Sequence, residues 1–166
     1  MSLFNYSVFP DFMIIGAQKS GTTTLHELLS QHPKICSSKT KELHYFDKTI
    51  DKRGSIDSYK CNFKKKIFSK KKFFESTPSY LYQNDFGKQV KIHNPNIKLI
   101  IILRDPVERA FSAWNMFRDM FENFPDQVKS LKNDYGETHP IYKLLFLNKK
   151  EFPSFEECLN LEKDIE

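Results

Sequence analysis

An apolar run that leads into a glycine-bounded loop constrains this chain more than any other feature. The run at residues 12–15 is followed by Gly16-Ala17-Gln18-Lys19-Ser20-Gly21-Thr22-Thr23 and then by an amphipathic segment. Gly16 and Gly21 stand five residues apart, as do the two glycines of the nucleotide-binding pattern G-x-x-x-x-G-K-[ST]. Glycine lets a backbone turn tightly and approach a ligand, and a following helix points unpaired N–H groups at it. The stretch therefore predicts a cradle for an anion such as a phosphate.

The loop departs from that nucleotide-binding pattern in the position of its lysine. Thr22-Thr23 follows Gly21 where a nucleotide triphosphatase has Lys-[Ser/Thr], and Lys19 lies inside the loop instead. The alternative interpretation is a strand-to-helix turn that binds nothing. The combination of an apolar strand, paired glycines, a lysine within the loop and three consecutive threonines favours the anion cradle.

Composition narrows the class of partner without naming one. The 166 residues suffice for one domain with a hydrophobic core, and the formal charge of +5 favours anionic partners. The three cysteines, Cys36, Cys61 and Cys158, have neither the spacing of metal ligands nor that of a disulfide framework. No signal peptide is visible, and no run approaches the roughly 18 apolar residues of a membrane span. We therefore expect a soluble chain with no membrane segment.

Alternating strands and helices are indicated along the chain. The apolar runs at 12–15, 35–36, 73–77 and 99–103 predict strands, and those at 12–15 and 99–103 are typical of buried strands in a parallel sheet. Pro78 ends the third of these strands. Helices are expected at 22–30, at 90–93, from 106 onward and from 155 onward. Residues 115–150 give no clear pattern.

Seven lysines gather in residues 60–72. A charge run of this kind is usually a solvated face or loop, which is the expectation here. A contact surface for an acidic acceptor is the alternative interpretation.

A second strand-to-helix junction occupies residues 98–114. Five apolar residues lead to Arg104, after which Asp105-Pro106-Val107-Glu108 combines an N-cap, a proline at the first helical position and a capping-box glutamate. Trp114 recurs on the apolar face of that helix, so we expect it in a core and not at a base-stacking surface. Ligands of open α/β sheets bind at such junctions. The residues expected to hold a second phosphate are Arg104 and Ser112, with Arg109 either nearby or paired with Asp105 or Glu108.

Two anion sites at strand-to-helix junctions suit a nucleotide with phosphates at both ends of its ribose. Here the sequence resembles the sulfotransferase family that uses 3′-phosphoadenosine 5′-phosphosulfate (PAPS), and within it the heparan-sulfate and glycan branch. Residues 16–23 resemble the family's 5′-phosphosulfate loop and residues 103–112 its 3′-phosphate motif. Residues 41–46 and 75–80 are similar to two segments of the heparan-sulfate-type branch. The resemblance runs from about Phe12 to Trp114.

The resemblance implies an α/β fold of the P-loop-containing nucleoside-triphosphate-hydrolase type, with a central parallel sheet flanked by helices. It implies a single sulfotransferase domain over residues 1–166. The family's domain is longer, and its C-terminal part supplies further strands and a nucleotide-binding loop. We therefore expect the chain to be the N-terminal portion of that domain, truncated at its C-terminus.

The resemblance also implies roles for single residues. Lys19 would contact the bridging oxygen of the phosphosulfate, where a lysine in a preorganised cradle stabilises the negative charge that develops. Glu42 matches the catalytic base of several glycan sulfotransferases, and His44 is the alternative base. No metal is required. Where many glycan-modifying members have a lysine, this chain has Ser76, so the acceptor stays open. The residues expected to bind the nucleotide are Gly16, Ala17, Gln18, Lys19, Ser20, Gly21, Thr22, Thr23, Arg104 and Ser112.

The function expected from these features is transfer of a sulfuryl group from PAPS to a hydroxyl or amine, with a carbohydrate as acceptor and no nucleic acid as partner. One alternative is a nucleotide kinase or triphosphatase with an aberrant loop, whose metal-binding carboxylate would be Asp105. The other is a truncated, non-catalytic domain that binds nucleotide or polyanion through Lys19, Arg104 and the lysine run. The expected compartment is the cytoplasm, or the Golgi lumen for an excised eukaryotic catalytic domain. The sequence indicates no oligomeric state.

Overall fold

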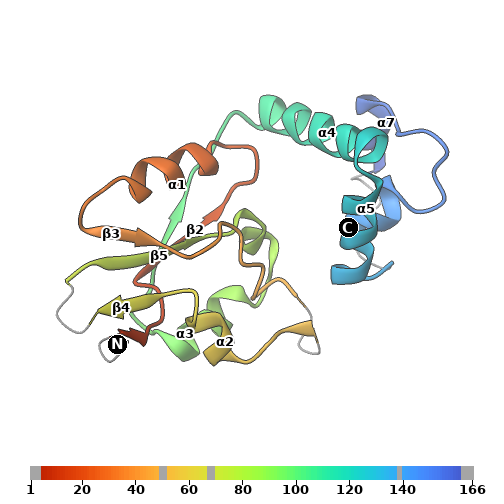
Figure 1. Cartoon of the computed structure of the whole chain (residues 1–166). Helices are drawn as coiled ribbons and strands as arrows, with labels where there is room; N and C mark the ends of the chain where they lie inside the picture. The colour runs from red at the N-terminus through yellow and green to blue at the C-terminus, as the bar shows by residue number, and fades with distance from the viewer. Residues whose placement is uncertain (1–4, 49–51, 67–69, 138–139, 162–166) are drawn as a thin grey trace. The chain divides into compact units, whose positions relative to one another are not determined.

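The chain forms two compact units, Met1–Arg104 and Asp105–Glu166. The computed structural model describes residues 5–48, 52–66, 70–137 and 140–161 (Figure 1). The expectation of a single domain over residues 1–166 remains a prediction.

A four-stranded sheet with the strand order β3-β5-β2-β6 forms the centre of the first unit (Figure 1). β2 (Phe12–Gly16) lies between β5 (Lys72–Ser76) and β6 (Lys98–Ile101) and is parallel to both. β3 (Ile35–Ser37) pairs in parallel with the other edge of β5. The predicted central parallel sheet is therefore confirmed.

Different elements cover the two faces of this sheet, and the side chains of β2 point alternately to one face and to the other. Met13 and Ile15 belong to the main core, whereas α1 (Thr22–Ser30) packs on the opposite face and places His26 against Phe74, with ring centroids 5.0 Å apart. Figure 1 shows α1 on one side of the sheet and α2 (Ile56–Lys60) and α3 (Phe86–His93) on the other. The buried members of the main core are Met13, Ile15, Phe46, Tyr59, Phe63, Phe73, Tyr80, Phe86 and Val90.

The expectation of a buried strand at 99–103 is wrong. β6 ends at Ile101, and its side chains are largely exposed, with Leu99 at 41% and Ile101 at 46%. Within the described residues, β6 has β2 as a neighbour on one side and forms the edge of the sheet on the other. An apolar run is buried on both faces only where other elements cover it, and the sequence of the strand itself does not reveal that covering.

The lysine-rich stretch is more ordered than the predicted loop. Phe63 is fully buried in the main core, and β4 (Lys64–Lys66) pairs antiparallel with β1 (Asn5–Ser7). Residues 67–69 lie outside the described residues. The expected strand at 73–77 ends at Ser76, since Pro78 begins a 3₁₀ helix, η2 (Pro78–Tyr82).

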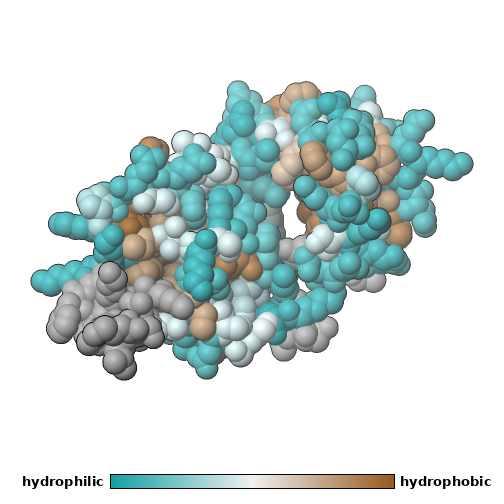
Figure 2. Space-filling model, in the orientation of Figure 1, coloured by the Kyte–Doolittle hydropathy of each residue, from teal (hydrophilic) through white to brown (hydrophobic). Residues whose placement is uncertain are grey.

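Figure 2 shows that hydrophilic side chains cover most of the face in view, with apolar side chains in scattered groups.

The second unit is helical and is built around an aromatic cluster. Trp114 of α4 (Pro106–Asn123) donates to the carbonyl oxygen of Pro153 at 2.9 Å and stacks on Phe111. Trp114 is half-buried and no residue of α4 is buried, so its expected place in a core remains a prediction. The predicted capping of α4 is confirmed, since the Asp105 side chain accepts from the Glu108 N–H at 3.0 Å. Two helices that the sequence analysis did not predict, α5 (Pro125–Tyr135) and α6 (Pro140–Leu145), precede α7 (Phe155–Leu161).

No helix among residues 5–48, 52–66, 70–137 and 140–161 is long and apolar enough to cross a membrane. The compartment of the protein remains a prediction.

Candidate active site

The loop between β2 and α1 presents a helix N-terminus to a ligand. α1 begins at Thr22, as predicted, and Gly21 is its N-cap with φ of 91°, a left-handed value that favours glycine. Gly21 has no side chain to cap the helix, so the N–H groups of the first turn face the loop without a capping side chain. Such N–H groups, together with the helix dipole, attract an anion.

Lys19 and Ser20 give the loop its polar side chains. Lys19 is half-buried and has a left-handed φ of 67°. The Ser20 hydroxyl is buried, and among the described residues it has no hydrogen-bond partner. A buried hydroxyl without a partner is unfavourable by about 1–3 kcal/mol, which a phosphate oxygen that accepts from it would offset. The residues of the loop therefore fit a bound phosphate.

Gly16 and Ala17 serve the fold of the loop. A Cβ atom at Gly16, where φ is 152°, would lie 2.9 Å from both Cβ and Cδ2 of Leu81. The Ala17 N–H donates to the Ile102 carbonyl oxygen at 2.8 Å, and the Ile102 N–H donates to the Gly16 carbonyl oxygen at 2.8 Å. Leu81 therefore leaves no room for a side chain at position 16. A direct contact of either residue with the nucleotide remains a prediction.

Arg104 links the two predicted phosphate motifs within the first unit. It follows β6, and its Nη1 donates to the carbonyl oxygen of Lys19 at 3.4 Å. Ser112 and Arg109 lie on α4 in the second unit. The structure therefore brings Arg104 to the loop, and the joint phosphate site of Arg104 and Ser112 remains a prediction.

Glu42 and His44 meet in the segment that follows β3, and a third residue joins them. His44 Nε2 lies 3.5 Å from Glu42 Oε2, and His44 Nδ1 lies 2.7 Å from Oδ2 of Asp47. The Asp47 side chain is fully buried and also accepts a hydrogen bond from the Ser79 hydroxyl. Lys41 pairs with the other carboxylate oxygen of Glu42. Asp47 was not among the predicted site residues, although its position three residues after His44 could have suggested it.

Contacts within this cluster shift the pKa values of Glu42 and His44 in opposite directions. The hydrogen bond from His44 lowers the pKa of Glu42 to about 2, with Lys41 adding to an effect that burial opposes. Burial by itself would lower the pKa of His44, but its hydrogen bonds to Asp47 and Glu42 raise that pKa to about 9. At neutral pH the cluster therefore holds a carboxylate at Glu42 and an imidazolium at His44.

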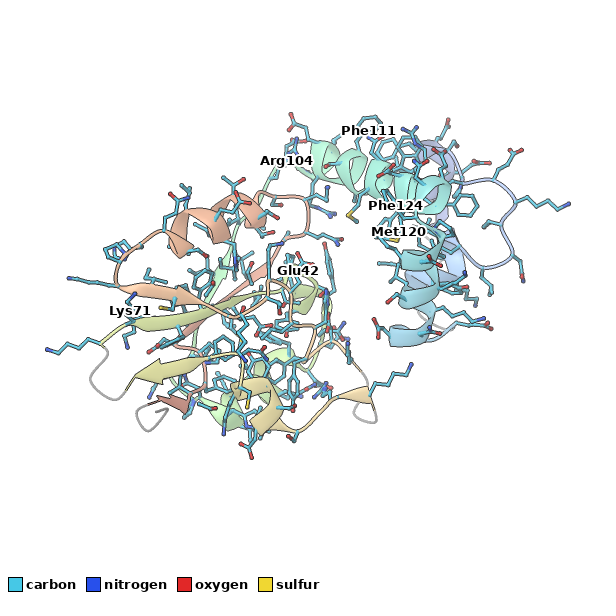
Figure 3. All side chains as sticks on the ribbon, viewed as in Figure 1. Glu42, Lys71, Arg104, Phe111, Met120 and Phe124 are labelled. Carbon is cyan, nitrogen blue, oxygen red and sulfur yellow. The ribbon has the colours of Figure 1, made fainter. Side chains whose placement is uncertain are left out.

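The Glu42–His44–Asp47 cluster and the loop 16–23 both lie at the carboxyl ends of the parallel strands. The Glu42 N–H donates to the carbonyl oxygen of Ser76 at 3.0 Å, at the end of β5. Ser76 is paired in register with Ile14 of β2, two residues before the loop begins at Gly16. Figure 3 shows Glu42 where β5 leads into η2. The carboxyl ends of parallel strands are where open α/β sheets bind ligands.

Comparison with known proteins decides the family. The model of the sulfotransferase domain family matches residues 9–157. The chain belongs to the sulfotransferase family. A sulfotransferase structure from Alicyclobacillus acidocaldarius superimposes with a TM-score of 0.60 at 29% identity, over 76% of this chain and 57% of that one. The predicted family and the predicted sulfotransferase-type α/β fold are thereby confirmed.

Two curated relatives show which sulfotransferases this family member is similar to. The membrane-associated sulfotransferase kil1 of Dictyostelium discoideum is 35% identical over 108 residues, which are 64% of this chain and 22% of that protein. Heparan sulfate glucosamine 3-O-sulfotransferase 5 of Mus musculus is 34% identical over 107 residues, 63% of this chain and 30% of that protein. This sulfotransferase-family chain thus spans less than a third of the length of either relative.

Across the part of the chain that the structure describes, no three His, Cys, Asp or Glu side chains gather as a metal site would require. Within the described residues, Cys36, Cys61 and Cys158 form no disulfide bond. The expectation that no metal is required remains a prediction.

Proposed function

We propose that this chain binds PAPS and transfers its sulfuryl group to a hydroxyl or amine of a carbohydrate. The observation that carries the proposal is the shared edge of the sheet, where the loop 16–23 follows β2 and the Glu42–His44–Asp47 cluster is anchored on the neighbouring strand β5. An anion cradle and a proton acceptor at one edge are what transfer of a charged group to a hydroxyl needs.

The donor nucleotide would be held by the loop 16–23 and by Arg104 of the first unit. When bound, PAPS supplies the sulfuryl group and carries negative charge at both ends of its ribose. The α1 N–H groups, the Ser20 hydroxyl and the Lys19 ammonium would stabilise the charge that grows on the departing phosphate oxygen. Arg104 would meet the second phosphate as a charged hydrogen-bond donor.

Glu42 is the proton acceptor in this proposal. With a pKa raised to about 9, His44 is protonated at neutral pH and has no lone pair to offer. Glu42, with its pKa lowered to about 2, is deprotonated but a weak base. A weak base suffices late in sulfuryl transfer, because the attacking hydroxyl becomes strongly acidic as its oxygen bonds to sulfur. His44 would hold the Glu42 carboxylate in place and stabilise its charge.

The carbohydrate acceptor is supported by relatives whose names specify heparan sulfate. A second candidate function is nucleotide binding without transfer, for which the loop 16–23 and Arg104 would suffice. Family membership favours both over a nucleotide kinase.

Titration calorimetry with adenosine 3′,5′-bisphosphate in the absence of Mg²⁺ tests the donor site. We expect binding to the native chain and a loss of about 10–100-fold in affinity for Lys19→Ala. Lys88→Ala, which removes a surface charge in α3, should keep the native affinity. Binding of ATP alone, and only with Mg²⁺, would overturn the donor assignment. Incubation with labelled PAPS and a panel of unsulfated glycans then separates transfer from binding without transfer.

A further inference from the structure

The backbone between His44 and Asp47 is held from two directions by side chains that the proposed chemistry does not use. From one direction the Tyr80 hydroxyl accepts from the N–H of Tyr45 at 3.0 Å and from the N–H of Phe46 at 3.5 Å. From the other, the Arg53 guanidinium donates to the carbonyl oxygens of Phe46 at 3.1 Å and Lys48 at 3.0 Å. The Phe46 carbonyl belongs to the peptide group that precedes the Asp47 Cα, and the Lys48 carbonyl lies one residue beyond Asp47, so Arg53 contacts the backbone on both sides of Asp47.

A buried carboxyl group orients the Tyr80 hydroxyl. Glu75 is fully buried at the end of β5 and accepts from the hydroxyls of Tyr80 at 2.7 Å, of Thr77 at 2.8 Å and of Tyr59. A phenol has one proton to donate. Because the Tyr80 hydroxyl donates its one hydrogen bond to Glu75, its oxygen can only accept from the N–H groups of Tyr45 and Phe46. Burial raises the pKa of Glu75 and outweighs the hydrogen bonds from the three hydroxyls, which act to lower that pKa.

Arg53 is itself anchored, so it can hold the segment. Its Nη1 donates to the side-chain oxygen of Gln89 on α3, and its guanidinium lies 5.8 Å from the ring centroid of Tyr45 and 5.9 Å from that of Phe46. The planar guanidinium has five donors in a fixed geometry. It therefore connects the segment to α3 through directed contacts.

The conformation of the segment needs such support. Glu42 and His44 have left-handed φ values of 60° and 48°, which are unfavourable for residues other than glycine. Strained residues of this kind persist only when surrounding contacts hold them.

We infer that Tyr80 and Arg53 are positioning residues of the candidate active site, which hold Asp47 on Nδ1 of His44 and thereby keep Nε2 of His44 directed at Glu42. The positioning of Asp47 and His44 does not depend on the proposed function, whereas the expected effect on turnover rests on the proposed function. Glu75 acts one step further away by orienting Tyr80.

Two tyrosine variants with matched chemistry test the inference. Tyr80→Phe and Tyr59→Phe each remove one hydroxyl from Glu75. Within the described residues, however, the Tyr59 hydroxyl makes no hydrogen bond with the backbone of the 44–48 segment. The readout is the pKa of His44, followed by NMR of its imidazole. Among the described residues, Asp47 and Glu42 contact the ring and Lys41 pairs with Glu42, and neither variant alters any of the three.

We expect Tyr80→Phe to lower the pKa of His44 by about one unit or more toward its ordinary value, and Tyr59→Phe to leave it unchanged. Arg53→Met, which keeps the aliphatic stem, should lower it as Tyr80→Phe does. It also supplies the test if Tyr80→Phe does not fold. An unchanged His44 titration in the folded Tyr80 and Arg53 variants, or an equal shift in both tyrosine variants, would overturn the inference.

Turnover gives a second and separable readout. In a transfer assay, Tyr80→Phe and Arg53→Met should lower kcat while the affinity for adenosine 3′,5′-bisphosphate stays native, because neither residue contacts the loop 16–23 in the described hydrogen bonds. If the native chain does not bind the bisphosphate, the proposed function fails and the NMR comparison still decides the positioning role.

Discussion

The Nδ1 atom of His44 lies 2.7 Å from Oδ2 of Asp47, whose side chain is fully buried. The opposite ring nitrogen faces Glu42 at 3.5 Å. The imidazole therefore connects a buried carboxylate to a partly exposed one, and both favour its protonated form. This relationship makes the charge of His44 a property that pH experiments can detect.

His44 should make stability fall at alkaline pH. Its pKa rises from 6.5 to about 9 on folding, so its contribution is complete below pH 6.5 and is lost as pH rises through 9. We expect the urea midpoint of the native chain to decrease over that window and the slope to be smaller in His44→Gln. His32→Gln, at an exposed histidine, is the control and should keep the native slope. Equal slopes in all three proteins would contradict the charge assignment.

Replacing Glu42 by Gln should abolish most transfer and leave nucleotide binding intact. The substitution removes the proton acceptor with little change in shape, so we expect kcat to fall about 10²–10⁴-fold. Calorimetry should return the native affinity for adenosine 3′,5′-bisphosphate. Glu27→Gln, at an exposed carboxylate of α1, should retain the native kcat. Native kcat in Glu42→Gln would exclude Glu42 as the base.

Arg104 can be tested by pairing one substitution with two ligands. Loss of a charged hydrogen bond to the 3′-phosphate should weaken the binding of adenosine 3′,5′-bisphosphate to Arg104→Ala by about 10–100-fold. Adenosine 5′-monophosphate lacks that phosphate, so its affinity should not change. Equal losses for both nucleotides would mean that Arg104 acts by shaping the loop through the Lys19 carbonyl oxygen, to which it donates at 3.4 Å.

Alanine substitutions at two glycines should change stability in opposite directions. Gly16→Ala would place a Cβ 2.9 Å from two atoms of Leu81 at a φ of 152°, which we expect to destabilise the fold by about 1–3 kcal/mol. Gly87 lies in α3 with nothing within 4 Å of an added Cβ, so Gly87→Ala should stabilise by about 0.5–1 kcal/mol. Urea unfolding measures both changes. A neutral Gly16→Ala would show that Leu81 can move aside.

Local patterns predicted much of the first unit. The helix at 22–30 has the predicted bounds, because the left-handed φ of 91° at Gly21 makes that residue the N-cap and Thr22 the first helical residue. The capping of α4 by Asp105 likewise depends on neighbours within one turn. The uncovered edge at β6 could not be predicted, because an apolar run is the same sequence whether or not another element covers it.

The sequence by itself determined the glycine-bounded loop between a strand and a helix, with Lys19 inside it, and its resemblance to the family named Glu42 and His44 as alternative bases. Only the tertiary structure placed Asp47 under His44, Tyr80 against the 45–46 peptides and Arg53 against Phe46 and Lys48. The reason is physical. A loop motif is specified by residues adjacent in the chain, whereas Tyr80 reaches its peptide partners across 34 and 35 residues, at positions that only the packed core brings together.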